Sequence, residues 1–332
     1  MRSTEVITHA AHAEARRLRP VHDDAELAAL AEAGRALPTI RVFRNAEGRL
    51  DAEGRGHEGH DNAGRMPFVC DFLKERVLPL IDPEVDVRGA YRIELHDAYS
   101  YLPSRRPHVN ALSFGRPKGG AESVALLPDP YQMADYGGLL SVRDAAVPWT
   151  SKAPVLFFAG TTTGDRDPTK NERIRACVWS LAHHDSARFY ITNVAQMTLQ
   201  DAVGRVPDLR AALRPAVPVA DHFAFKYQVN IAGNTACWSR VPMIMASRCL
   251  MLELPQRDAT WYSHLLSDGV HYVAADGLDD LLKKRAFCMA NDAWCEQLTV
   301  NANRFVRSYL GSAQAAAYTA QLLEAAASAG AP

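Results

Sequence analysis

The stretch KYQVNIAGNTACWSR, from Lys226 to Arg240, decides the fold. Its first half has the composition of a strand, and its Gly-Asn-Thr turn is followed by residues that suit the start of a helix. A strand, turn and helix in this order direct free backbone N–H groups and the positive end of a helix dipole at one point. The stretch therefore predicts an anion-binding turn, although a plain capped helix remains the alternative.

The rest of the chain continues this alternation of strand-like and helix-like segments. Strands are predicted at 39–43, 91–95, 109–114, 123–127, 154–158, 189–192, 223–231, 249–254 and 271–273, and helices at 3–19, 22–36, 68–81, 170–183, 198–214, 235–247, 278–289, 292–310 and 312–329. Such alternation is typical of α/β proteins with parallel sheets, which bind ligands outside the carboxyl ends of their strands. The Pro- and Gly-rich segment 128–153 predicts a boundary between domains at 1–150 and 151–311, followed by an Ala-rich helix at 312–332.

Composition narrows the class of protein. The 332 residues carry a net charge of −1, which gives no support for nucleic acid as a partner. The apolar runs are too short to span a bilayer, and the first residues lack the apolar core of a secretion signal. Six dispersed cysteines predict reduced thiols and do not have the spacing of a zinc site. We therefore expect a cytoplasmic protein without a transmembrane segment, with peripheral contact at the inner face of the membrane left open.

Two strand ends carry residues suited to phosphate. The first is GTTTG, from Gly160 to Gly164, which follows the apolar PVLFF and precedes Arg166 and Arg173. Glycines let the backbone approach a phosphate, hydroxyls donate hydrogen bonds, and arginine pairs well with diphosphate oxygens. A polar turn with a solvated basic helix face is the alternative. The second strand end is the Gly-Asn-Thr turn.

A third strand end carries a carboxylate. Asp97 follows YRIEL, and a carboxylate at such a position can act as a general base, whereas a loop aspartate that caps a neighbouring group is the alternative. His57 and His60 stand in a Gly-rich segment without metal-ligand spacing, so a solvated loop is predicted there. The chain has neither the nucleophile elbow of α/β-hydrolases nor the glycine fingerprint of dinucleotide-binding enzymes.

These three strand ends occur together with the segments FKYQVNIAGNTACWSRVPMIMASRCLMLEL, WYSHLLSDGVHYV, DGLDDLL and ANDAWCEQLTVNANRFVRSYL. The combination resembles glycosyltransferase family 90, which includes capsule-associated xylosyltransferases, protein O-glucosyltransferases and bacterial lipopolysaccharide-modifying proteins. The resemblance covers about residues 88–310. It implies a GT-B fold, in which two Rossmann-like domains face each other across a cleft.

The resemblance also implies an activity. It indicates an inverting, metal-independent transfer of a glucose- or xylose-type sugar from a UDP-sugar to a hydroxyl of a glycan or glycolipid acceptor, such as lipopolysaccharide or another envelope glycan. No cofactor is expected beyond the donor. A catalytically inactive nucleotide-sugar-binding protein of the same fold is the alternative.

Site residues follow from the same resemblance, position by position. Asp97 matches the catalytic base, and the residues matching the nucleotide-sugar site are Gly160, Thr161, Thr162, Arg166, Arg173, Lys226, Gly233, Asn234, Thr235 and Arg240. The chain departs from the family pattern at Ala159, where an arginine is common. Arg240 also stands one residue later than the family's helix arginine, which on a continuous helix rotates a side chain by about 100°. Arg166 competes with Arg173 for the role of the loop arginine.

Overall fold

The computed structural model describes residues 3–18, 38–56, 58, 62–97, 111–120, 124–136 and 147–329. The predicted helix 22–36 and both loop histidines, His57 and His60, lie outside the described residues. The chain forms two compact units. Unit 1 comprises Met1–Asp135, Asp258–Ser263 and Ser308–Pro332, and unit 2 comprises Tyr136–Arg257 and His264–Arg307. The predicted domain bounds at 150 and 311 thus differ from the observed change at residue 136, and unit 1 takes in two later segments.

Unit 1 is built on a mixed sheet with the strand order β2-β1-β3-β4-β6. Its strands are β1 (Thr39–Arg44), β2 (Leu50–Arg55), β3 (Gly89–Glu94), β4 (Ala111–Ser113) and β6 (Val124–Leu126). Strands β3, β4 and β6 are parallel, whereas β1 is antiparallel to both β2 and β3. Strand β2 is not among the strands predicted from the sequence. Its charged and glycine residues hide a strand that forms a hairpin with β1 at Gly48, whose φ of 76° suits glycine.

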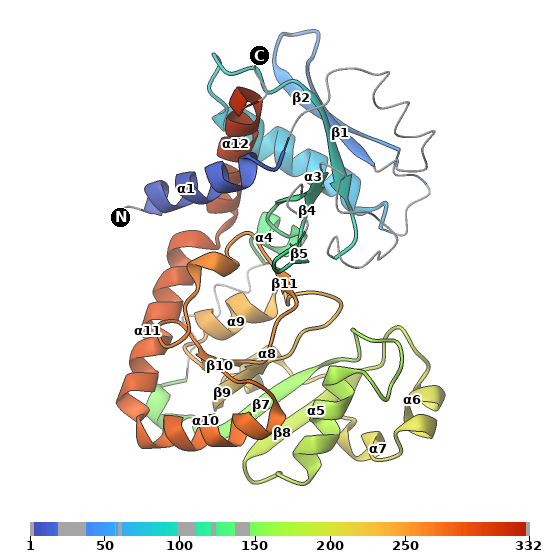
Figure 1. Ribbon diagram of the computed structural model, residues 1–332, viewed down its shortest axis with the longest axis vertical. Coiled ribbons are helices and arrows are strands. Elements are labelled where there is room, and N and C mark those ends of the chain that lie inside the picture. The colour runs from blue at the N-terminus through green and yellow to red at the C-terminus, as the bar shows by residue number, and fades with distance from the viewer. Residues whose placement is uncertain are drawn as a thin grey trace. The chain divides into compact units, whose positions relative to one another are not determined.

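The helices of unit 1 include both ends of the described chain. They are α1 (Ser3–Ala15), α3 (Arg65–Phe72), the π- and 3-10 turns Leu73–Val77 and Leu78–Leu80, α4 (Pro130–Met133) and α12 (Ser312–Ala329). Two further strands, β5 (Arg116–Pro117) and β11 (Asp258–Ala259), pair with each other. Helices α1 and α12 lie side by side, and their alanines allow close packing (Figure 1).

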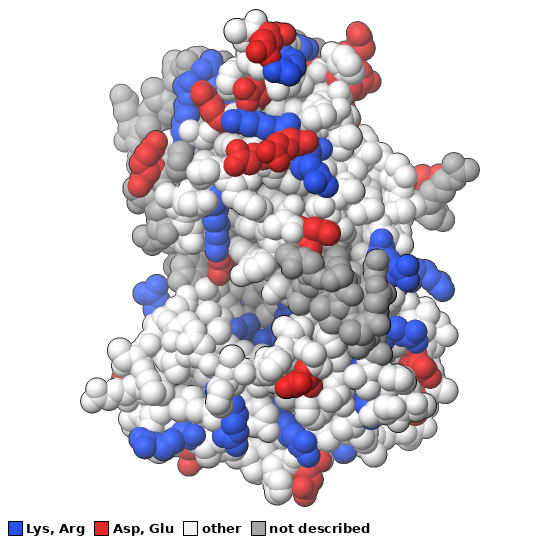
Figure 2. Space-filling model, turned by 180° about the vertical axis from the view of Figure 1, so that it is seen from behind, with Lys and Arg blue, Asp and Glu red and all other residues white. Residues whose placement is uncertain are grey.

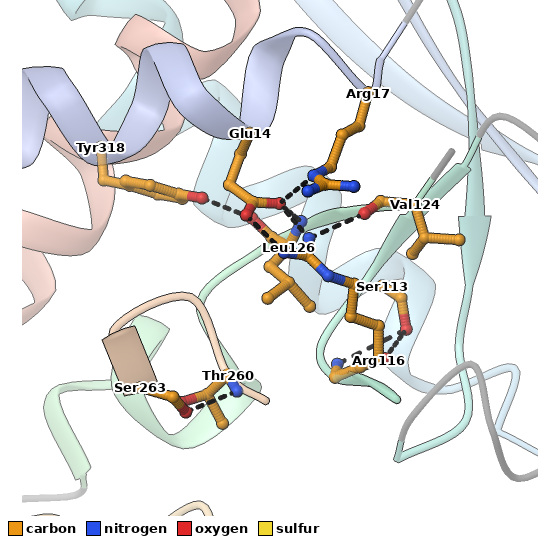
Figure 3. Close-up of polar contacts among 10 residues, drawn as sticks. Glu14, Arg17, Ser113, Arg116, Val124, Leu126, Thr260, Ser263 and Tyr318 are labelled. Atoms are coloured by element: carbon orange, nitrogen blue, oxygen red, sulfur yellow. Dashed lines mark hydrogen bonds and ion pairs between the residues drawn. The ribbon is translucent and has the colours of Figure 1, made fainter. Parts of the chain in front are cut away.

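A buried carboxylate fixes α1 to the strands of unit 1. Glu14 is 6% exposed and accepts hydrogen bonds from both terminal nitrogens of Arg116 and from the backbone N–H of Leu126 (Figure 3). Arg116 also donates to the carbonyl oxygen of Val124 at 2.9 Å, and the hydroxyl of Tyr318 donates to that of Leu126 at 2.8 Å. The bidentate ion pair between Glu14 and Arg116 thus joins α1, β5 and β6. The hydrogen bond from Tyr318 joins α12 to β6.

Unit 2 contains a five-stranded, fully parallel sheet with the order β12-β10-β9-β7-β8. Its strands are β7 (Ala153–Thr161), β8 (Ala187–Asn193), β9 (Phe225–Asn230), β10 (Leu250–Glu253) and β12 (Val273–Ala274). Side chains alternate between the two faces of a strand. On β7, Phe158 lies in the core together with Ile174 of α5, whereas Phe157 contacts His222 of α8. Helices therefore cover both faces, which confirms the predicted α/β class with parallel sheets.

The helices of unit 2 begin and end at identifiable residues. They are α5 (Glu172–Leu181), α6 (Leu199–Arg205), α7 (Leu209–Ala212), α8 (Val219–His222), α9 (Arg240–Ala246), α10 (Leu278–Ala290) and α11 (Asp292–Tyr309), with 3-10 turns at Trp149–Ser151 and Ser263–Leu265. The predicted helix 198–214 is interrupted at Pro207, which has no N–H to donate. The predicted helix 235–247 instead begins at Arg240, because residues 233–239 form turns.

The surface agrees with the near-neutral net charge. Figure 2 shows basic and acidic side chains interspersed over the face that it draws, without a large area of one sign. None of the helices in the described ranges has the length and apolar character required to cross a membrane.

Candidate functional site

Two neighbouring strands of unit 2 bring both predicted phosphate loops to one edge of the sheet. Strands β7 and β9 pair in parallel, so the loops that follow them begin side by side. The backbone N–H of Gly164 donates to Oδ1 of Asn234 at 3.0 Å and so joins the two loops directly. Gly164 has φ of 131°, a conformation that side chains rarely adopt.

Arg173 joins the same two loops through its guanidinium group. The residue is 7% exposed, and its nitrogens donate to Oγ1 of Thr163 at 2.6 Å and to the carbonyl oxygens of Ala232 at 3.0 Å and Ile231 at 3.1 Å. Asn171 caps α5 at this point, since its Oδ1 accepts from the backbone N–H of Arg173 at 3.1 Å. The cap aims the arginine back across the end of the sheet.

Arg240 reaches this edge from the first turn of α9. One terminal nitrogen donates to the carbonyl oxygen of Ala159 at 2.8 Å, and the guanidinium carbon lies 4.4 Å from the centre of the Phe158 ring. The guanidinium carbon of Arg173 lies 5.8 Å from the centre of the same ring. The expected 100° rotation does not apply, because the six residues between Gly233 and Arg240 are not helical.

The two guanidinium groups leave positive charge at this edge. Burial lowers the pKa of Arg240 to about 10; Cys237 opposes this shift, and the neighbouring charge of Arg173 adds to it. Across the described ranges, neither guanidinium group forms an ion pair with a carboxylate. Two adjacent, partly desolvated cations without a counter-charge form a site suited to an anion with several oxygen atoms.

Glycines make room for both arginines. A Cβ atom on Gly160 would lie 2.7 Å from a terminal nitrogen of Arg240, and one on Gly233 would lie 2.8 Å from a terminal nitrogen of Arg173. Both distances are shorter than carbon and nitrogen atoms tolerate without a shift. Gly160 and Gly233 therefore act through close approach rather than through an unusual φ.

The threonines of the first loop make different contacts. Thr162 is fully buried, and its hydroxyl bridges the backbone N–H and carbonyl oxygen of Ala195, both at 2.8 Å, so it fixes the loop to the residues after β8. Thr161 and Thr163 bring their hydroxyl oxygens within 3.2 Å of each other beside Arg173. Thr163 is not among the site residues predicted from the sequence, although it stands in the same Gly-Thr-Thr-Thr-Gly run.

Thr235 does not begin a helix, contrary to the predicted helix 235–247. Its carbonyl oxygen accepts from the backbone N–H of Gly233 at 3.1 Å, and its side-chain hydroxyl is buried without a hydrogen-bond partner among the described residues. The turn after β9 therefore offers a buried hydroxyl rather than the N-terminus of a helix. The helix-dipole argument for anion binding at Gly233 does not hold.

Lys226 lies away from the two loops, and Arg166 lies in the first loop with its side chain exposed. Lys226 is on the amino end of β9, seven residues and roughly 20 Å of strand before Gly233. Its Nζ contacts Oδ1 of Asp292 at 2.6 Å and lies 4.7 Å from the centre of the Trp149 ring, so its place in the phosphate turn was wrong. Arg166 has an exposed side chain in the loop after β7, which favours Arg173 as the loop arginine.

Asp97 lies in unit 1, just after β3. Its Oδ1 accepts from a terminal nitrogen of Arg65 at 2.7 Å, and Arg65 also donates to the carbonyl oxygen of Leu95 at 2.6 Å. Both side chains of the ion pair are about one quarter exposed. Arg65, at the start of α3, was not anticipated, because no local pattern links it to a residue 32 positions later.

Comparisons with known proteins show which sequences the chain resembles. Residues 137–329, more than half of the chain, match Glycosyl transferase family 90. The uncharacterized protein 179R of Invertebrate iridescent virus 6 is 30% identical over 210 residues, covering 54% of this chain and 17% of that protein. Protein O-glucosyltransferase 2 of Danio rerio is 29% identical over 94 residues, covering 27% of this chain and 18% of that protein. The chain spans less than a fifth of the length of the curated relatives it matches.

Solved structures show a weaker likeness. The C-terminal domain of a group 1 glycosyl transferase, LpcC of Francisella tularensis, has a TM-score of 0.35 and 10% identity, covering 56% of this chain and 96% of that one. A TarM variant of S. aureus, solved with UDP, has a TM-score of 0.38 and 11% identity, covering 52% and 36%. These scores are too low to carry an argument about this chain, so membership rests on the sequence match. The chain belongs to glycosyl transferase family 90.

Proposed function

We propose that the chain transfers a sugar from a nucleoside-diphosphate donor, UDP-glucose or UDP-xylose, to a hydroxyl group of a glycan acceptor. The observation that carries the proposal is the pair of guanidinium groups, Arg173 and Arg240, at the carboxyl edge of the unit 2 sheet without a carboxylate partner in the described ranges. A diphosphate has the charge and the several oxygen atoms that two such groups can bind. Family membership makes a sugar nucleotide the natural source of that diphosphate.

The same two groups would assist departure of the diphosphate. Negative charge grows on the leaving oxygens as the bond to the sugar breaks, and fixed positive groups in a partly desolvated site stabilise that charge. Arg173 is held by at least three neutral acceptors before any ligand arrives, so little reorganisation is required. The proposal assigns to these arginines the role that a divalent ion has in other transferases.

Asp97 is proposed as the general base. The acceptor oxygen would attack the anomeric carbon while the bond from that carbon to the diphosphate breaks, and Asp97 would take the acceptor's proton. This single displacement inverts the anomeric configuration. The ion pair with Arg65 would orient the carboxylate.

Substitution of Asp97 tests this assignment. Asp97→Asn keeps the size of the side chain but removes the proton acceptor, so we expect the turnover rate to fall by about 10²–10⁴-fold with unchanged affinity for UDP. Transfer is measured by release of UDP from UDP-glucose or UDP-xylose with an envelope glycan extract as acceptor. Asp86→Asn is the matched control, because Asp86 forms an exposed ion pair with Arg88 in the same unit. Equal rates for Asp97→Asn and wild type would contradict the proposal.

A protein that binds a sugar nucleotide without reacting is the second candidate, favoured by Ala159 at a position where an arginine is common in the family. The same measurements separate the two candidates. A wild-type chain that binds UDP tightly but neither transfers nor hydrolyses any donor would support the binding protein. Acceptor identity and the location at the inner face of the membrane or in the cytoplasm stay predictions.

A further inference from the structure

Cys237 differs from the other cysteines of the chain. All six lie within the described residues, and five of them are buried, whereas Cys237 is half-buried. It stands in the turn between β9 and α9. Its thiol is therefore the cysteine sulfur that a reagent in solution can reach most easily while the protein stays folded.

The sulfur of Cys237 contacts one of the two arginines of the candidate site. A terminal nitrogen of Arg173 donates to Sγ at 3.1 Å, and the thiol donates to the carbonyl oxygen of Ile231 at 3.1 Å. The interaction with Cys237 also counteracts the lowering of the Arg240 pKa that burial causes. Cys237 thus connects Arg173 to the end of β9.

A second feature of the same turn points to a bound ligand. Thr235 is only 6% exposed, and its Oγ1 has no hydrogen-bond partner among the described residues. A buried hydroxyl without a partner is costly, so such groups usually meet a ligand or water. Thr235 stands two residues before Cys237 in this turn, and its unpartnered hydroxyl adds to the two guanidinium groups without a carboxylate partner in the described ranges as support for an anion site at this edge of the sheet.

We propose that Cys237 is a positioning residue of this anion site, and that covalent modification of its thiol abolishes binding of the anion. The inference rests on the proposed function only in naming the anion as the diphosphate of the donor. In the test reaction with iodoacetamide, sulfur forms a bond to the methylene carbon, iodide leaves and the thiol proton passes to solvent. The added group occupies space beside the guanidinium group of Arg173 and removes the donor to Ile231.

The experiment labels the full-length, folded chain with limiting iodoacetamide and locates the label by peptide mass spectrometry. We expect Cys237 to react before the five buried cysteines, and UDP and inorganic pyrophosphate each to slow its reaction. Protein labelled at Cys237 should bind UDP about tenfold more weakly or worse in calorimetry, because the added group displaces the guanidinium group of Arg173 from its observed position. Labelled protein with unchanged affinity would overturn the proposal.

Two variants separate positioning from mere structural support. Cys237→Ser keeps a donor and an acceptor, so it should retain UDP affinity within about threefold and make that affinity insensitive to iodoacetamide. Cys237→Ala should raise KM for the donor more than it lowers kcat. Cys70→Ser, in unit 1, should change neither the labelling of Cys237 nor its effect.

The probes also distinguish this inference from the proposed function. Slower labelling with pyrophosphate but not with UDP would uphold the anion site and contradict a uridine nucleotide as its ligand. If neither anion slows labelling, Cys237 does not belong to an anion site. A Cys237→Ser variant that loses affinity as completely as Cys237→Ala would also overturn the positioning role, because the conservative substitution would have failed to rescue binding.

Discussion

Arg116 in unit 1 and Arg173 in unit 2 are both largely buried arginines that tie separate elements together, yet their charges are treated differently. The guanidinium group of Arg116 meets the carboxylate of Glu14 with two nitrogens. The guanidinium group of Arg173 meets carbonyl oxygens, a hydroxyl and a thiol, all of them neutral acceptors. Glu14 thus neutralises the charge of Arg116, whereas no carboxylate in the described ranges neutralises the charge of Arg173. We therefore expect the charge of the partner, rather than burial, to distinguish a structural arginine from one that binds an anion.

Removal of the charge on Glu14 should have the largest effect, and it should be confined to unit 1. Glu14→Gln leaves Arg116 buried without a counter-charge, so we expect a loss of about 3 kcal/mol in the stability of unit 1. Hydrogen exchange resolved by peptide in increasing urea measures each unit separately. The double variant Glu14→Leu with Arg116→Met should recover most of the loss, since it removes both charges. UDP affinity should not change, and a parallel loss in unit 2 would contradict the comparison.

The converse experiment removes the positive charge of Arg173, which has no carboxylate partner in the described ranges. Arg173→Met should weaken UDP binding by about 100-fold, which corresponds to roughly 2.7 kcal/mol and to the loss of charge-assisted hydrogen bonds. Calorimetry measures the affinity, and Arg173→Lys should fall between the two because it keeps the charge but not the planar fork. The exposed Arg175, on the same helix, supplies the control Arg175→Met. If Arg116→Met weakened UDP binding as much as Arg173→Met, the division into structural and binding arginines would be untenable.

The elements that carry the second centre could be predicted from the sequence because their signals are local. PVLFF predicts a buried strand. Glycines after the two strands predict a close approach of other groups to the backbone, which is observed at Gly160 and at Gly233. The resemblance to the family supplied Arg173 and Arg240. Sequence patterns place such residues at strand ends, and parallel pairing of β7 and β9 then brings the ends together.

What the sequence could not supply depends on contacts between distant residues. Threonine is a common helix cap, but Thr235 lies in a turn and not at the start of a helix. Arg173 donates a hydrogen bond to the carbonyl oxygen of Ile231 just before this turn, 58 residues away along the chain. The positive charge of Lys226 suits a phosphate ligand. However, Lys226 is the second residue of β9, at the amino end of the strand, and its Nζ contacts Asp292 instead. In both cases tertiary contacts override a correct local preference.

The two units should also respond to pH in opposite directions. Burial raises the pKa of Asp129 in unit 1 to about 7, although backbone N–H groups of Gln132 and Tyr131 act against it. The folded state then keeps a proton that the unfolded state releases near pH 4, so unit 1 loses stability as pH rises from about 4 to 7. Burial lowers the pKa of His222 in unit 2 to about 4, against 6.5 for an ordinary histidine. Unit 2 therefore loses stability as pH falls from about 6.5 to 4.

We expect each change to amount to about 2 kcal/mol, less than the full shift would give, because local relaxation weakens such effects. Hydrogen exchange in urea at pH 5 and pH 8, corrected for the pH dependence of exchange chemistry, measures both units in one sample. Asp129→Asn keeps the cap of α4 but cannot ionise, so it should remove the loss in unit 1 and leave unit 2 unchanged. His222→Phe should do the reverse. Parallel pH responses in both units would contradict these assignments.

The smallest effect should come from the two glycines, and it tests how firmly each arginine of unit 2 is held. A Cβ on Gly233 meets the guanidinium group of Arg173, which is fixed by hydrogen bonds to both loops, whereas a Cβ on Gly160 meets that of Arg240, for which one backbone acceptor is observed. Gly233→Ala should thus weaken UDP binding by about tenfold, or roughly 1.4 kcal/mol, because the bound geometry must shift. Gly160→Ala should cost about threefold, since Arg240 can move aside. Gly204→Ala, where no atom lies near the added methyl group, is the control in calorimetry. A larger loss for Gly160→Ala would mean that Arg240, and not Arg173, is the rigid part of the site.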